Sequence, residues 1–352
     1  MRLENVTDVG TWFRHRLRDD VDEVSIERVG RVSRGVSRET WIVDARVVRD
    51  GTASDMSFVV RRDLPDGTVI PMPLREEYEV YRRLAGSAVP AARALWMEED
   101  PRWQPDGRPA YVRTKIDGNW YLPFLSSDDP ADDDRKIAAS KEHLDKLALV
   151  HTTDWRALGF DEIGTVPESV KHCATALLDD IETWLATFRL EPSPAVTEAL
   201  SQLRDSAPTD SPCIALCKGT NGHGEEVWSD DGRIVAMSDW ELWRLGDPAY
   251  DFAQVQEMVP EIVRDGRRLW GWPEALEYYR ARTGIDISPE RLAYYRACYG
   301  LIQFCYAHHS AHRVRAGASS IRLVWNATEV QYRSQLKLGA ACGFAPETGT
   351  TT

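Results

Sequence analysis

The residues with the clearest chemistry are acidic side chains that follow a short apolar run in the second half of the chain. Asp239 comes two residues after the run RIVAM at 233–237, and Asp247 and Asp251 follow in the same stretch. A carboxylate held at the end of a buried strand suits Mg²⁺, which takes oxygen ligands in a fixed geometry. Asp239 taken alone is better explained as a turn residue or a helix cap. We interpret Asp247 and Asp251 as structural residues that cap and brace the loop.

The whole stretch SDWELWRLGDPAYDFAQV at 238–255 is more specific than any single aspartate. It resembles the aminoglycoside phosphotransferases and their relatives, including choline-kinase-like enzymes and the kinase-like domains attached to some acyl-CoA dehydrogenases. The resemblance covers roughly 25–340 and implies an α+β, two-lobed protein-kinase-like fold. It also implies that ATP and Mg²⁺ are cofactors, that a small molecule is the substrate, and that Asp239 binds the metal ion that bridges the ATP phosphates.

The segment expected to be the catalytic loop, at 215–228, departs from the family pattern. The family reads His-Gly-Asp, four further residues and Asn, whereas this chain reads LCKGTNGHGEEVW. Counting back from Asp239 with the family's spacing places Lys218 at the His, Thr220 at the catalytic base and Glu225 at the Asn. A shifted frame that starts at His223 leaves too few positions before Asp239, and we do not adopt it.

These replacements change the chemistry expected of the loop. Glu225 still offers an oxygen ligand, so it and Asp239 are the candidate metal ligands. Thr220 has no titration near neutrality, so its hydroxyl cannot accept a proton as a carboxylate can. His223 or Glu226 is a candidate substitute base, and Lys218 is a candidate to neutralise a phosphate or activate a carbonyl.

Segments nearer the N-terminus supply the expected nucleotide contacts by the same resemblance. VVRRD at 59–63 resembles the strand whose basic residue holds the α- and β-phosphates, with Arg61 as the match and Arg62 as the alternative. Glu77 matches the carboxylate partner on the following helix. The turn over the phosphates is matched by Ser33, Gly35 and Ser37, and the backbone of Val112 to Thr114 is expected to meet the adenine.

Composition narrows the function classes. The formal charge is −13 and no long basic run is present, so we expect no nucleic-acid partner. The N-terminus lacks an apolar signal core and nowhere do about 18 apolar residues run together, which predicts a cytoplasmic protein without a membrane segment. Six cysteines without paired metal-binding spacing are expected to be reduced. Composition does not distinguish a monomer from a homodimer.

The elements that must position these residues change in type along the chain. Short runs of β-branched and aromatic residues with Gly and Asp-Gly turns predict a small antiparallel sheet in the first hundred residues. Helical spacing predicts a helix at about 74–86, another at about 135–151, and a mainly helical remainder. We therefore predict a nucleotide-binding lobe at 1–114 and a helical lobe at 115–352, the latter with a metal-binding segment at 238–252.

Three functions fit this pattern. The first is Mg-ATP-dependent transfer of phosphate to a hydroxyl of a small molecule. The second is ATP-independent chemistry on a biosynthetic intermediate, carried by Lys218, His223, Glu225 and Glu226. The third is a non-catalytic, pseudokinase-like protein that binds a nucleotide or an acyl-CoA.

Overall fold

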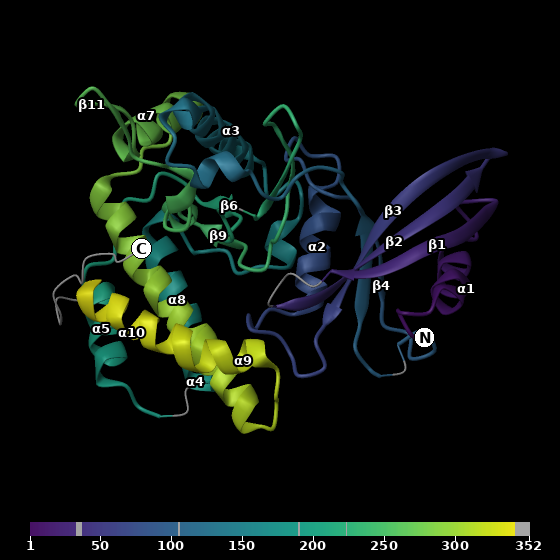
Figure 1. The fold of residues 1–352 in the computed structure, drawn as a ribbon. Helices are drawn as coiled ribbons and strands as arrows, with labels where there is room; N and C mark the ends of the chain where they lie inside the picture. Colours follow the sequence, from purple (N-terminus) through teal and green to yellow (C-terminus); the bar gives the residue numbers. More distant parts are fainter. Residues whose placement is uncertain (33–36, 105, 189–190, 223, 342–352) are drawn as a thin grey trace. The chain divides into compact units, whose positions relative to one another are not determined.

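A computed structural model describes residues 1–32, 37–104, 106–188, 191–222 and 224–341 (Figure 1). The chain forms two compact units. The N-terminal unit contains Met1–Ala85 and Ala92–Ile116, and the C-terminal unit contains Gly86–Ala91 and the chain from Asp117 onward. The α+β class expected from the sequence is confirmed, because a strand-rich unit precedes a mainly helical one.

The N-terminal unit is built on a five-stranded antiparallel sheet in the order β1-β2-β3-β5-β4. Long β-branched runs form its strands, and the two-residue turn at Asp50 and Gly51, both with positive φ, joins β2 to β3. The register sets Thr40 opposite Arg61 and Val60 opposite Val112. The strands are β1 Glu23–Val32, β2 Arg38–Arg49, β3 Thr52–Asp63, β4 Ala94–Glu98 and β5 Ala110–Thr114.

Two helices pack on opposite faces of this sheet (Figure 1). Helix α1, Val6–Leu17, was not expected from the sequence, and its Trp12 and Phe13 join Phe58 and Val60 in a fully apolar core. Helix α2, Leu74–Leu84, occupies the expected range of the chain and faces the other side, where Arg61 lies. Because side chains alternate along a strand, β3 presents Phe58 and Val60 to α1 and Arg61 to α2.

The C-terminal unit is mainly helical, with the long α8 at its centre packed against α4, α6 and α10. Its N-cap Ser288 accepts a hydrogen bond from the Arg291 amide, and Pro289 occupies the first helical position. The helices are α3 Asp133–Thr152, α4 Cys173–Phe188, α5 Pro194–Asp205, α6 Ala249–Phe252, α7 Trp272–Thr283, α8 Pro289–Arg315, α9 Ile321–Trp325 and α10 Gln331–Ala341. A π-helical turn, Asn326–Val330, joins α9 to α10.

Short strand pairs in this unit frame the loop that carries the candidate catalytic residues. β6 pairs with β9 and β7 pairs with β8, so the loop leaves β6 and returns in β7. These strands are β6 Ala215–Cys217, β7 Glu226–Trp228, β8 Ile234–Met237 and β9 Arg244–Gly246, and a separate hairpin contains β10 Ile262–Arg264 and β11 Arg267–Trp270. The two pairs fix both ends of the loop and place Asp239 directly after β8.

Candidate functional site

The loop between β6 and β7 is held by one buried carboxylate. Asp251 of α6 accepts the backbone N–H of Lys218 at 2.8 Å and of Gly219 at 2.6 Å, and the Asn221 amide side chain at 3.1 Å. Burial alone would raise the pKa of Asp251, but the hydrogen bond from His151, the charge of His151 and the two backbone amides lower that pKa below its ordinary value. The Asp251 carboxylate is therefore held ionised and fixes the start of the loop.

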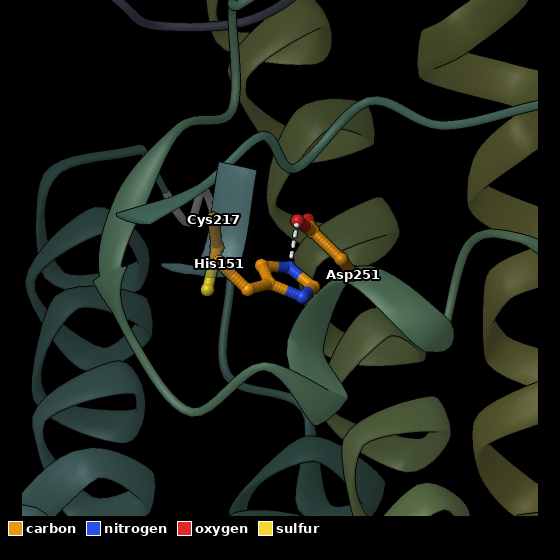
Figure 2. Close-up of side chains that lie close together, drawn as sticks. All are labelled: His151, Cys217 and Asp251. Atoms are coloured by element: carbon orange, nitrogen blue, oxygen red, sulfur yellow. Dashed lines mark hydrogen bonds and ion pairs between the residues drawn. The ribbon is translucent and has the colours of Figure 1, made fainter. Parts of the chain in front are cut away.

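Figure 2 shows how His151 of α3 supports the same carboxylate. His151 Nε2 lies 2.8 Å from Asp251 Oδ2, and His151 Nδ1 lies 2.7 Å from the Tyr279 hydroxyl. Cys217 completes a group whose potential ligand atoms lie within 4.8 Å of one another. Burial raises the pKa of the Cys217 thiol well above its ordinary value, which disfavours the thiolate that a metal needs. We interpret this cluster as structural.

Gly219 has a conformation and a position that only glycine fits. Its φ is +84°, and a Cβ there would lie 2.0 Å from the Leu242 carbonyl oxygen. No side chain can be accommodated at that distance without moving the backbone. The backbone of the loop therefore packs directly against the backbone of the segment after β8. This close packing brings Thr220 next to Asp239.

Thr220 lies at the position expected for the catalytic base, and its hydroxyl is used by the backbone. Thr220 Oγ1 donates a hydrogen bond to the carbonyl oxygen of Asp239. The hydroxyl therefore ties the loop to the acidic segment. This contact gives Thr220 a positioning function in the described structure.

Lys218 and Glu226 do not lie where the sequence analysis expected catalytic groups. Both side chains are 0% exposed, and Lys218 Nζ donates to the carbonyl oxygen of Thr220 and lies 3.8 Å from Glu226 Oε1. Glu226 Oε1 is also 3.1 Å from His143 Nε2 of α3. Neither side chain reaches the surface of the described structure, and both contact other groups of the same loop. His223, the other candidate base, lies outside the described residues.

Glu225 and Asp239 are brought together at the surface of the loop. The charge of Asp239 acts on the Glu225 carboxyl group, and both residues are partly exposed. Partial burial and the neighbouring charge of Asp239 raise the pKa of Glu225 to about 8. Asp239 has a φ of +61°, a left-handed conformation that is uncommon for a non-glycine residue. This backbone conformation sets the direction of its side chain.

In the N-terminal unit, the expected pair of Arg61 and Glu77 is also in contact. Arg61 Nε lies 3.3 Å from Glu77 Oε1, and the Tyr111 hydroxyl donates to the same oxygen at 2.7 Å. The sequence analysis missed Arg38, whose Nε lies 3.0 Å from Glu77 Oε2. Glu77 is 0% exposed, so its charge is compensated by two guanidinium groups.

The alternative basic residue, Arg62, points to the other side of β3. It binds Glu39 at 2.6 Å and Asp106 at 3.3 Å, which makes Arg61 the candidate that faces α2. Val112 and Thr114 lie inside β5 between two strands, and the Thr114 amide already donates to the Arg93 carbonyl. Any contact with adenine must therefore use other backbone groups at this strand end. Ser37, the residue before β2, is buried. Ser33 and Gly35 lie outside the described residues.

His151 and Asn221 hold the loop in place but were not among the site residues predicted from the sequence. His151 lies in the stretch LALVHTTDWRALGF at 147–160, which resembles the helix and turn that precede the catalytic loop in the family, and Asn221 lies inside the loop. Their contacts with Asp251 join three segments that are far apart in the chain. Asp247 precedes the N-cap residue Pro248, and its Oδ1 accepts the amide of Ala249, the first residue of α6, at 2.8 Å.

Comparison with known proteins gives the same family. The profile of the phosphotransferase enzyme family matches residues 31–295. Among curated proteins, acyl-CoA dehydrogenase family member 10 of Mus musculus is 25% identical over 209 residues, and family member 11 of Mus musculus is 23% identical over 255 residues. These matches cover 57% and 68% of this chain but only 18% and 29% of the relatives, so the chain spans less than a third of their length.

Solved structures of similar fold cover nearly the whole chain. A candidate aminoglycoside phosphotransferase from Ralstonia eutropha has a TM-score of 0.66 at 19% identity, with 97% of this chain and 98% of that chain covered. A thermostable mutant of aminoglycoside phosphotransferase APH(4)-Ia, in ternary complex with ADP and hygromycin B, has a TM-score of 0.59 at 17% identity, with 97% and 100% covered. At these identities the likeness shows the fold, and the profile match over most of the chain shows that this protein belongs to the phosphotransferase enzyme family.

Proposed function

We propose that this protein transfers a phosphoryl group from Mg-ATP to a hydroxyl of a small molecule. The observation that carries the proposal is that Glu225 and Asp239 are near enough for the charge of Asp239 to raise the pKa of Glu225. Neighbouring carboxylates repel each other unless a proton or a cation lies between them. The neighbours crystallised with ADP and with other nucleotides lend family-level support for ATP.

The donor set fits Mg²⁺. Glu225 and Asp239 offer only oxygen atoms, and their partial exposure leaves room for the water ligands that Mg²⁺ retains. Neither thiol nor imidazole ligands adjoin them among the described loop residues, so the site does not favour a softer metal. When bound, the cation would neutralise charge on the phosphate oxygens.

The protein's own residues supply positioning rather than proton transfer. Asp251 fixes the backbone of Lys218 and Gly219, and the Thr220 hydroxyl ties the loop to Asp239. Thr220 cannot accept the proton of the attacking alcohol, so that proton leaves to solvent or to a phosphate oxygen. Because phosphoryl transfer depends mainly on alignment and charge neutralisation, turnover is retained at a reduced rate.

Arg61 is the proposed phosphate contact in the N-terminal unit. Its guanidinium is oriented by Glu77, which is itself fixed by Tyr111 and Arg38. An arginine offers parallel N–H donors that match two phosphate oxygens. This interaction replaces the single ammonium group that most kinases use there.

The test has two parts. Calorimetric titration with Mg²⁺ and the non-hydrolysable analogue AMP-PNP is expected to show saturable binding that Asp239→Asn removes. ADP release is then measured with a panel of alcohol-bearing metabolites, with phosphorylated product identified by mass spectrometry. Absence of AMP-PNP binding to the wild-type protein would rule out the proposal.

A second candidate, nucleotide binding without turnover, is favoured by one observation: the only hydroxyl at the base position already donates to Asp239. In that case AMP-PNP binds and no alcohol in the panel is phosphorylated. The ATP-independent chemistry considered from the sequence has less support, because Lys218 and Glu226 of its proposed acid and base set are fully buried.

A further inference from the structure

The N-terminal unit contains a cavity on the sheet face opposite Arg61. Its volume is about 310 Å³, which reaches the lower end of the range of small-molecule pockets. Val47, Met56 and Phe58 of β2 and β3 form an apolar floor, and Trp96 of β4 forms a wall. The cavity is therefore distinct from the Arg61 and Glu77 pair, which lies on the α2 side of the same sheet.

The cavity exists because α1 is too short to cover the sheet. β2 and β3 contain 12 residues each and extend for about 40 Å, at roughly 3.3 Å per residue. α1 also contains 12 residues but is only about 18 Å long, at 1.5 Å per residue. Beyond its C-terminal end, at Leu17, Met56 is partly exposed at the floor, and the core side chains of Val47 and Phe58 lie beneath it with 3% and 2% of their surface exposed.

The rim of the cavity is basic, in a protein whose net charge is strongly negative. Arg49 at the end of β2 and Arg93 just before β4 are exposed residues that line it. Arg49 donates to the backbone oxygen of Asp20 at 3.0 Å, and no described carboxylate pairs with it. The Arg93 guanidinium has no hydrogen-bond or ion-pair partner among the described residues, because both hydrogen bonds of Arg93, with the Thr114 hydroxyl and the Thr114 amide, are made by its backbone.

The third arginine of the rim is already neutralised. Arg16 lies 2.6 Å from Glu98 Oε1, and Glu98 also accepts the Trp12 indole N–H at 2.6 Å. The remaining charges are the guanidinium groups of Arg49 and Arg93 against the single carboxylate of Asp20. An apolar floor under an excess of guanidinium groups is complementary to a molecule with an apolar body and an anionic end.

We propose that this cavity is a second ligand site, which binds a small amphipathic carboxylate with its apolar body on Val47, Met56 and Phe58. The carboxylate is held by Arg49 or Arg93. The site is independent of Mg-ATP, because its residues lie on the opposite face of the sheet from Arg61.

Hydrocinnamate, an aromatic ring on a short chain ending in a carboxylate, is the probe. Binding is measured by calorimetry and ligand-observed NMR without Mg²⁺ or nucleotide, so failure of the proposed kinase function does not affect the result. We expect saturable binding, and at least about tenfold weaker binding of hydrocinnamyl alcohol, which has the same body without the charge.

Three variants locate the site. The double substitution Arg49→Ala and Arg93→Ala is expected to weaken binding by about tenfold or more, because the charge-assisted hydrogen bonds are lost. Met56→Trp, which fills the floor, is expected to abolish binding. Arg46→Ala is the matched control: Arg46 is an exposed arginine three residues from Arg49 but on the other sheet face, and binding should be unchanged.

The proposal is overturned by any of three results. These are no saturable binding to the wild-type protein, equal binding of acid and alcohol, or unchanged binding to the double variant. Thermal unfolding of each variant confirms that the fold is intact, and the two arginines are exposed, so their removal leaves the core unaltered.

Discussion

His151 Nε2 lies 2.8 Å from Asp251 Oδ2, which links α3 to the carboxylate that anchors the loop between β6 and β7. The contact is fully buried, and the same carboxylate accepts the amides of Lys218 and Gly219. The Asp251 side chain thus connects α3 to the start of the loop between β6 and β7.

Substitution of Asp251 tests this anchor. Asp251→Ala leaves two buried amides and an imidazole without their acceptor, so we expect a loss of about 3 kcal/mol or more in the free energy of unfolding. Urea denaturation followed by circular dichroism measures it. Asp179→Ala, at an exposed aspartate of α4, is the control and should cost less than about 1 kcal/mol. Similar losses in both variants would contradict the anchoring function.

The pH dependence of stability follows from the same carboxylate. Because the pKa of Asp251 is lower in the folded protein than in the unfolded chain, the unfolded chain binds more protons on acidification. The stabilisation is complete above the ordinary aspartate pKa of about 4 and is lost as the pH falls through the lower, folded value. Thermal unfolding from neutral to acid pH should show a shallower decline in Asp251→Asn than in the wild-type protein; parallel curves would argue against it.

Restoring the acid at the base position should increase the rate of phosphoryl transfer. Thr220→Asp introduces a carboxylate that can accept the proton of the alcohol, and general-base catalysis contributes roughly 10²-fold or more. ADP release with a responsive acceptor measures the change. Thr220→Asn has the same shape without the basic group and should show no gain. Equal rates in the two variants would mean that the base position does not limit turnover.

The carboxylate pair should reduce stability when no cation is bound. The pKa of Glu225 is raised to about 8 by partial burial and by Asp239, so the folded protein binds more protons and loses stability as the pH rises from about 4 through 8. Glu225→Gln removes this repulsion. We expect its unfolding free energy without Mg²⁺ to exceed that of the wild-type protein by about 1 kcal/mol at pH 9.

The same variant should lose the response to ligand. Mg²⁺ with AMP-PNP is expected to raise the melting temperature of the wild-type protein and not that of Glu225→Gln. Glu162→Gln changes an exposed acid away from the loop and should behave as wild type. A Glu225→Gln protein that is destabilised and still responds to Mg²⁺ would contradict the assignment of Glu225 as a ligand.

The two adjacent arginines of β3 should have separable effects. Arg61→Ala is expected to weaken AMP-PNP binding by about tenfold, since a charged hydrogen bond to phosphate is lost. Arg62→Ala breaks the pairs with Glu39 and Asp106 on the other face and should reduce stability with little change in nucleotide affinity. Calorimetry and urea denaturation on both variants distinguish the two effects. A larger affinity loss in Arg62→Ala would reverse the assignment.

The sequence predicted the fold class and the helix that carries Glu77, because apolar periodicity and turn residues are local signals. It did not predict α1. The N-terminal segment is rich in charged residues, and its Trp12 and Phe13 become core residues only when the sheet is present. The hairpin of β10 and β11 was missed because its strands are very short and carry arginines.

Within the site, the sequence could predict contacts between neighbouring strands, but it could not predict buried contacts between segments far apart in the chain. The Glu225 and Asp239 pairing follows from strand spacing, since β7 and β8 are antiparallel neighbours. The burial of Lys218 and Glu226 depends on His143 of α3, which lies far away in the chain. No local pattern marks these two side chains as inward-facing, so residue type alone suggested a catalytic function for them.

The close approach of residue 219 to Leu242 also limits how this loop can change. At the neighbouring positions the side chains of Lys218 and Thr220 find partners in backbone carbonyl groups, and Glu225 is partly exposed. At 219 even a methyl group would collide with main-chain atoms. A combinatorial library intended to find new reactions on this scaffold should therefore vary the neighbouring positions and keep that one glycine constant.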